Sequence, residues 1–290
     1  MRYLVFVTLL WAFSFSLIGE YLAGRVDSYF AVLTRVVIAG LVFLPLTRWR
    51  GVAPAFVRGM LLIGALQFGV TYVCLYLSFS VLSVPEVLLF TVLTPLHVTL
   101  IEDAFNRRFN PWALLAAAVA VAGAALIRYD RIGADFYVGF FLLQIANATF
   151  AAGQVFYKHL LARYPSPIPS YRRFGYFYLG ALVVALPAFL LFGNPSHLPQ
   201  SALQWGVLVW LGLAASGLGL YWWNKGASLV DGGTLAVMNN ALVPAGLLVN
   251  LLLWNRDADL GRLALGGAVI AASLWLTRLG ASPQALKVVR

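Results

Sequence analysis

Polar side chains interrupt the long apolar segments of this sequence at a small number of positions, and those residues could bind a polar ligand. Arg35 lies in AVLTRVVIAGLVFLPL, and Asn239 and Asn240 are adjacent in TLAVMNNALVPAGLLVNLLLW. A guanidinium keeps its charge and presents a fork of donors that matches the two oxygens of a carboxylate. A carboxamide presents both a donor and an acceptor. These residue types predict recognition of a small polar molecule.

Each of these residues also has a structural interpretation that the sequence leaves open. Arg35 could cap broken helix ends, and a carboxamide in a membrane helix can join two neighbouring helices, at about 0.6 kcal/mol on average. On a helix, Asn239 and Asn240 point about 100° apart, so one can face a cavity while the other contacts a neighbouring helix. The motif Asn147-Ala148-Thr149 has the pattern of a glycosylation acceptor. It lies inside an apolar segment, so we assign it no function.

A second set of candidates follows Pro85. Glu86, Phe90 and His97 are spaced by four and seven residues, which places them on one face of a helix. Glu86 and His97 can titrate, so both are candidates for carrying a proton coupled to transport. The alternatives are structural. A carboxylate is stabilising near a helix N-terminus, and a lone histidine can form a hydrogen bond between helices.

The elements that must position these residues are membrane-spanning helices. Of the 290 residues, 62% are hydrophobic and 10% are charged, whereas soluble domains have about a quarter charged residues. Apolar segments of roughly 20 residues, long enough to cross a bilayer as a helix, recur along the chain. The sequence therefore predicts an all-α polytopic membrane protein with ten transmembrane helices. The predicted spans are 3–22, 28–47, 56–79, 85–103, 111–128, 134–158, 171–192, 203–224, 234–253 and 260–278.

The distribution of positive charge predicts which way the chain crosses the bilayer. Of the 20 Lys and Arg residues, one (Arg35) lies within a span and fourteen fall on the side of the two termini. We therefore expect both termini in the cytoplasm. The net charge of +10 is dispersed over short loops, which argues against binding to nucleic acid. The five cations on the opposite side are Arg25, Arg128, Arg131, Arg256 and Arg262.

The sequence also contains a weak internal repeat, because a shift of 149 residues aligns Tyr72 with Tyr221. Five helices per half is an odd number, so the two halves start on opposite sides of the membrane. Many secondary transporters have such inverted repeats, with the substrate site between the halves. The predicted units are residues 1–130 and residues 131–290, the second with a short cytoplasmic tail. The candidate wall residues of a central cavity are Tyr72, Tyr221, Trp11 and Phe90.

Several stretches together resemble the drug/metabolite transporter superfamily, and specifically its ten-helix EamA type. They are LLWAFSFSLIGEYL, Arg35 in the second span, LTPLHVTLIEDAFNRRFNPWALLAAAVAVAGAALI and LALGGAVIAASLWL. Asn255-Arg256-Asp257 departs from the family pattern, which usually has an acidic Gly-Glu there. GTLAVMNNALVPAGLLVNLLLW and IRYD look most like the bacterial biotin importers of this superfamily.

This resemblance implies uptake of biotin by alternating access across the bacterial inner (plasma) membrane. If the substrate is biotin, Arg35 is the candidate for binding its carboxylate, and Asn239 and Asn240 are the candidates for binding its ureido ring. The alternatives are export of amino acids, amines or drugs, a membrane-embedded enzyme, and a scaffold subunit. The sequence has no nucleotide-binding loop, so we expect a secondary transporter without catalytic residues, cofactors or a metal. The expected partners are biotin and the lipid bilayer, and no oligomer is required.

Overall fold

The computed structural model describes residues 1–105, 134–230 and 232–254, together with single or paired positions between 111 and 122 and between 260 and 272. All regular secondary structure in these residues is helical. Six of the described helices are long and apolar enough to cross a membrane, and Ser28–Phe43 and Met238–Leu253 are shorter apolar helices. The prediction of an all-α polytopic membrane protein is confirmed.

Eight of the predicted spans correspond to helical units in the described part of the chain. The other two, 111–128 and 260–278, lie mostly outside it. The units are α1 (Arg2–Leu17) with η1 (Ile18–Leu22); α2 (Ser28–Phe43); α3 (Pro54–Gly64), η2 (Ala65–Val70) and α4 (Thr71–Ser78); α5 (Val84–Phe90), η3 (Thr91–Leu93) and α6 (Thr94–Phe105); α8 (Ala134–Arg163); η5 (Ser170–Arg172) and α9 (Gly175–Phe192); η6 (Pro195–His197); α10 (Ala202–Trp210), η7 (Leu211–Leu218) and α11 (Gly219–Ala227); and α12 (Gly232–Leu253).

Local sequence signals explain where several of these helices begin. Asp27 caps α2, because its Oδ1 accepts a hydrogen bond of 2.7 Å from the backbone N–H of Phe30. Ser83 and Glu86 form a capping box at the start of α5, and a proline occupies the first turn. Ser201 and the glutamine three residues later form a second capping box at the start of α10. Polar residues at these ends satisfy backbone donors that lipid could not.

Three of the described helical units contain a π-helical segment, which sequence periodicity did not predict, and η1 is the one that follows α1. Segment η2 lies between α3 and α4, and segment η7 lies between α10 and α11. Such segments leave the regular α-helical hydrogen bonding and occur frequently at functional sites. Tyr178 stabilises η7, because its hydroxyl donates to the carbonyl oxygens of Ser216 at 3.0 Å and Gly217 at 2.8 Å.

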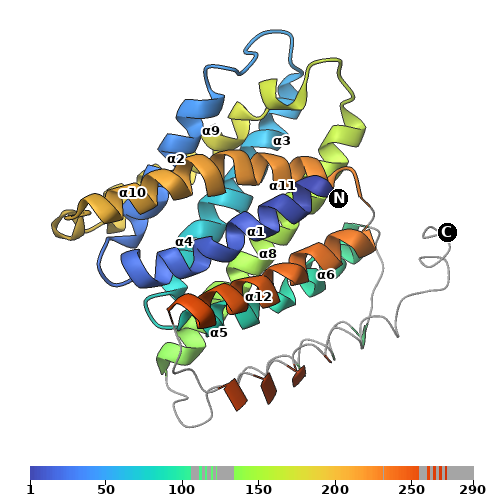
Figure 1. Cartoon of the computed structure of the whole chain (residues 1–290). Helices are drawn as coiled ribbons and strands as arrows, with labels where there is room; N and C mark the ends of the chain where they lie inside the picture. Colours follow the sequence, from blue (N-terminus) through green and yellow to red (C-terminus); the bar gives the residue numbers. More distant parts are fainter. Residues whose placement is uncertain are drawn as a thin grey trace.

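The helices pack in a bundle in which α1 contacts both α11 and α12 (Figure 1). Helix α8 contacts α4 and α6, α2 contacts α9 and η7, and α9 contacts α3 and η2. Helices α3 and α9 approach with backbone against backbone. A Cβ added at Gly64 would collide with the carbonyl oxygen of Phe177, and one at Gly180 with the carbonyl oxygen of Leu61. Small residues permit such close contacts between membrane helices.

Candidate functional site

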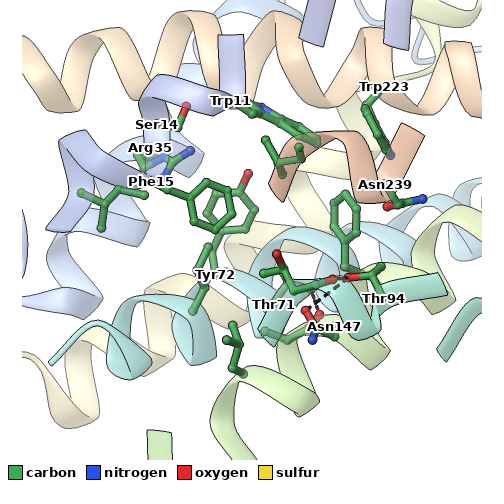
Figure 2. A pocket seen from close by; sticks show the side chains of 17 residues that line it. Trp11, Ser14, Phe15, Arg35, Thr71, Tyr72, Thr94, Asn147, Trp223 and Asn239 are labelled. Atoms are coloured by element: carbon green, nitrogen blue, oxygen red, sulfur yellow. Dashed lines mark hydrogen bonds between the residues drawn. The ribbon is translucent and has the colours of Figure 1, made fainter. Parts of the chain in front are cut away.

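A cavity lies among these helices (Figure 2). It is lined by side chains from α1, α2, α4, α8, α11 and α12, with further contributions from η1, η3 and α6. Most of these side chains are aliphatic or aromatic, and a few are polar. A mostly apolar lining with a small number of polar groups is typical of sites for small molecules. The lining therefore combines both halves of the sequence around one volume.

Arg35 is the charged residue of the lining and is only 1% exposed. Its Nε donates to Ser216 Oγ at 2.9 Å, and its Nη1 donates to Tyr76 Oη at 3.0 Å. Its guanidinium carbon lies 4.5 Å from the centroid of the Tyr72 ring, within range of a cation–π interaction. Within the described residues, no carboxylate pairs with it and its Nη2 makes no hydrogen bond. A buried cation held only by neutral groups is costly in a membrane.

Asn239 lies elsewhere in the lining and forms a reciprocal pair with Gln154 of α8. Gln154 Nε2 donates to Asn239 Oδ1 at 3.3 Å, and Asn239 Nδ2 donates to Gln154 Oε1 at 3.1 Å. Asn239 Nδ2 also donates to the carbonyl oxygen of Leu235 at 3.0 Å. Asn239 thus borders the cavity and also joins α8 to α12.

Asn147 adds a second carboxamide to the lining, and the sequence analysis overlooked it. Its Nδ2 donates to the carbonyl oxygen of Phe90 at 3.0 Å, and its Oδ1 accepts from Thr94 Oγ1 at 3.3 Å (Figure 2). Asn147 forms part of a glycosylation-like motif, but it also lies inside the predicted span 134–158. The rule that selected Arg35, namely a costly polar group inside a membrane helix, would also have selected Asn147 and Gln154.

Aromatic rings form a large part of the wall. Trp11 and Trp223 lie with their ring centroids 4.9 Å apart, and Phe150 lies 6.3 Å from Trp223. Trp11 is held in place by its Nε1, which donates to the carbonyl oxygen of Ala215 at 2.9 Å. Tyr72 forms the wall beside Arg35. These rings provide flat apolar surfaces against which a cyclic ligand can pack.

Four of the residues predicted to bind a ligand line this cavity, namely Arg35, Asn239, Tyr72 and Trp11. The other three lie outside its lining. The ring of Phe90 packs against Phe136 and Phe140. Tyr221 exchanges a hydrogen bond of 3.0 Å with Ser170. Asn240 is half-buried, and its Oδ1 has no hydrogen-bond partner among the described residues.

Glu86 and His97 both have local hydrogen-bond partners and lie outside the lining. Glu86 Oε2 accepts from the backbone N–H of Ser83 at 2.7 Å and from its Oγ at 2.8 Å. His97 Nδ1 lies 3.0 Å from the carbonyl oxygen of Leu93, one turn earlier. The 3₁₀ segment η3 also interrupts the regular helix on which their common face was predicted. The role of either residue in carrying a proton stays a prediction.

Apolar helices of membrane length around a cavity with a mixed lining define a multi-pass membrane protein with a candidate site for a small molecule. The sequence profile of the EamA-like transporter family matches residues 2–129. The chain is 74% identical to the probable biotin transporter of Pseudomonas aeruginosa, over 97% of this chain and 98% of that protein. It is 50% identical to the biotin transporter of Escherichia coli K12, over 98% of this chain and 95% of that protein. The chain therefore belongs to the EamA-like transporter family, and it is a transporter rather than an enzyme.

A relative from Salmonella has the same sequence identity to this chain as the Escherichia coli protein. The biotin transporter of Salmonella typhimurium is also 50% identical over 285 residues. A solved crystal structure with 20% sequence identity superimposes with a TM-score of 0.67 and covers 97% of this chain and 98% of its own. At that identity the similarity concerns the fold alone.

Proposed function

We propose that this protein imports biotin across the bacterial inner membrane as a secondary transporter, and that the cavity is its binding site. Relatives at 74% and 50% identity over nearly the whole chain are named biotin transporters. Biotin carries a carboxylate at one end and a neutral cyclic urea at the other, joined by apolar atoms. The cavity offers a cation, carboxamides and aromatic walls to match these three parts.

Arg35 provides the observation that carries the proposal. Its charge is almost completely buried beside the cavity, and no carboxylate within the described residues compensates it. The hydrogen bonds that Arg35 donates to Ser216 and Tyr76 fix the guanidinium but leave Nη2 without a partner among the described residues. The carboxylate of a ligand would supply the missing anion, and a charge-assisted bond of this kind is stronger than a neutral one.

The carboxamide side chains provide the second half of the recognition. The ureido ring presents two N–H donors and one carbonyl acceptor, and carboxamides can pair with both. Asn239 and Asn147 border the cavity and are the candidates for these bonds. Asn240, which the sequence analysis grouped with Asn239, lies outside the lining, so the proposal places the ureido ring near Asn239 and Asn147.

The described lining residues include no acidic side chain, which separates this proposal from its rival, export of amines or cationic drugs. Among the described residues that line the cavity, Arg35 is the charged one. A cationic substrate would meet repulsion there, and no lining carboxylate would compensate it. Amino acids carry a carboxylate as well as an ammonium, so they are the competitors that an experiment must include.

We further propose that the chain consists of two inverted five-helix repeats, residues 1–130 and 131–290, with both termini in the cytoplasm. The helix contacts support this symmetry. Under the repeat, α1 with α12 corresponds to α8 with α6, and α2 with η7 corresponds to α9 with η2. The π-helical segments η2 and η7 also lie at corresponding positions of their spans. Movement of one such half against the other would open the cavity to each side of the membrane in turn.

Counterflow into liposomes tests the function directly. The purified protein is reconstituted in vesicles loaded with unlabelled biotin, and labelled biotin is added outside. We expect labelled biotin to accumulate inside, and excess unlabelled biotin outside to suppress the uptake. Amino acids, diamines and cationic drugs are expected to have no effect. Exchange that amino acids inhibit and biotin does not would replace the import of biotin with the rival function.

A further inference from the structure

The indole N–H of Trp223 is a buried donor for which the described part of the chain provides no acceptor. Trp223 belongs to the cavity lining and is 1% exposed. Its Nε1 has no hydrogen-bond partner among the described residues. Buried donors in native proteins nearly always have a partner, and leaving one unpaired costs about 1–3 kcal/mol. Because Trp223 lines the cavity, a ligand bound there is a candidate acceptor for this hydrogen bond.

The residues around Trp223 explain why the protein itself does not supply the acceptor. Trp11 and Phe150, whose rings pack near the indole, have side chains without an acceptor oxygen. Asn239 is a polar member of the same lining (Figure 2), but its Oδ1 accepts from Gln154 and not from Trp223 Nε1. Trp11 is the natural comparison, because its own Nε1 does reach a carbonyl oxygen, that of Ala215. Both tryptophans belong to the same cavity lining, but among the described residues only the indole N–H of Trp11 has a hydrogen-bond acceptor.

We propose that Trp223 donates its indole N–H to the carbonyl oxygen of a cyclic urea in the cavity, which makes Trp223 a specificity-determining residue. This inference rests on the proposed function and deepens it. A urea carbonyl is a strong neutral acceptor, and the N–H groups on either side of it need acceptors of their own. The carboxamide oxygens of Asn239 and Asn147 each accept one hydrogen bond, from Gln154 and from Thr94, and their second lone pair can accept another. One donor and two carboxamides would then surround the ureido ring.

The test compares two ligands on two protein variants. The ligands are biotin and its thiocarbonyl analogue, in which sulfur, a weak acceptor, replaces the ureido oxygen. Binding is measured by calorimetry on the full chain in lipid nanodiscs. We expect the wild-type protein to prefer biotin. Trp223→Phe keeps an aromatic ring and removes the donor, so we expect it to weaken biotin binding about 5-fold. Binding of the thiocarbonyl analogue is expected to change by less than about 2-fold, because it has little hydrogen bond to lose.

The chain offers a matched control at the neighbouring position. Trp222 is half-buried, packs edge to face on Phe6 at 5.2 Å and lies outside the cavity lining. We expect Trp222→Phe to leave the preference for biotin at the wild-type value. If Trp223→Phe does not fold, Trp223→His, which keeps a ring N–H, takes its place, and we expect it to retain part of the preference.

Three outcomes would overturn the inference. They are an unchanged preference in Trp223→Phe, an equal loss of affinity for both ligands, and a Trp223→His variant that folds but loses the preference completely. Each of them leaves biotin import standing as long as the wild-type protein binds biotin. Failure of the wild-type protein to bind biotin at all would instead overturn the proposed function. The two proposals can thus fail separately.

Discussion

Tyr72 and Tyr221 align with each other under the 149-residue shift, but the structure gives them different surroundings. Tyr72 lines the cavity, with its ring 4.5 Å from the guanidinium carbon of Arg35. Tyr221 packs in what we call the aromatic cluster. Its ring lies 5.3 Å from that of Phe43 and 5.2 Å from that of Phe174. The members of the aromatic cluster are Phe43, Phe174, Phe177, Tyr178 and Tyr221.

Two residues that align under the 149-residue shift can therefore have different neighbours in the structure. Under the proposed inverted repeat, the two tyrosines lie towards opposite faces of the membrane. One face then has a hollow beside its tyrosine, and the other has rings packed into the corresponding volume. A transporter that exposes its site to one side at a time requires such an asymmetry in each of its states.

The two regions meet at Ser216 in η7. Arg35 Nε donates to the Ser216 side chain from the cavity side. Tyr178 of the aromatic cluster donates to the Ser216 backbone carbonyl oxygen. A movement of η7 would therefore act on both regions at once. The backbone hydrogen bonding of a π-helical segment is less regular than that of an α-helix, and this makes η7 a suitable place for such a movement.

The largest expected effect is a loss of stability at the α3–α9 contact, which includes Phe177 of the aromatic cluster. Gly64→Ala places a methyl group against the carbonyl oxygen of Phe177 at the α3–α9 contact. We expect a loss of stability of about 3 kcal/mol, at the upper end of the usual cost of overpacking. Thermal unfolding of the purified protein measures it. Gly206→Ala is the matched control, because a Cβ there meets no atom within 4 Å. Equal stability of the two variants would contradict the close packing at this contact.

A smaller effect tests the tyrosines themselves. Tyr72→Leu removes the ring that faces Arg35 and forms part of the cavity wall, so we expect biotin to bind about 10-fold more weakly. Tyr221→Leu changes the aromatic cluster and not the cavity, so we expect biotin affinity within about 2-fold of wild type and a lower unfolding temperature. Equilibrium binding and thermal unfolding of both variants give the comparison. A similar loss of affinity in both would remove the distinction between the regions.

Much of the fold was predictable from the sequence, because a bilayer imposes strong rules on length and polarity. Eight predicted spans correspond to helical units of the structure. Arg35 and Asn239 were predicted as site residues because a polar group inside a membrane helix is costly. Trp11 and Tyr72, chosen as walls from their place in the predicted bundle, also line the cavity.

The rest of the site depended on features that the sequence does not display. These helices are apolar on all sides, so periodicity does not indicate which face borders a cavity. The π-helical segments η2 and η7 further change the faces of their spans. Tyr221 and Phe90 were predicted at the cavity from the repeat, and Asn240 from its carboxamide, but none of the three belongs to the lining. Asn147 was not predicted as a site residue, because only its glycosylation-like motif was interpreted and not its position inside a membrane span.

Affinity for biotin and for its carboxamide, measured on the wild-type protein and on Arg35→Ala, tests the central claim most directly. A charge-assisted bond contributes about 1.5–3 kcal/mol, so we expect the wild-type protein to bind biotin at least about 10-fold more tightly than the carboxamide. Arg35→Ala is expected to bind both ligands with the same weak affinity, because the group that distinguishes them is gone. An Arg35→Ala variant that folds and still prefers biotin by the wild-type factor would contradict the account.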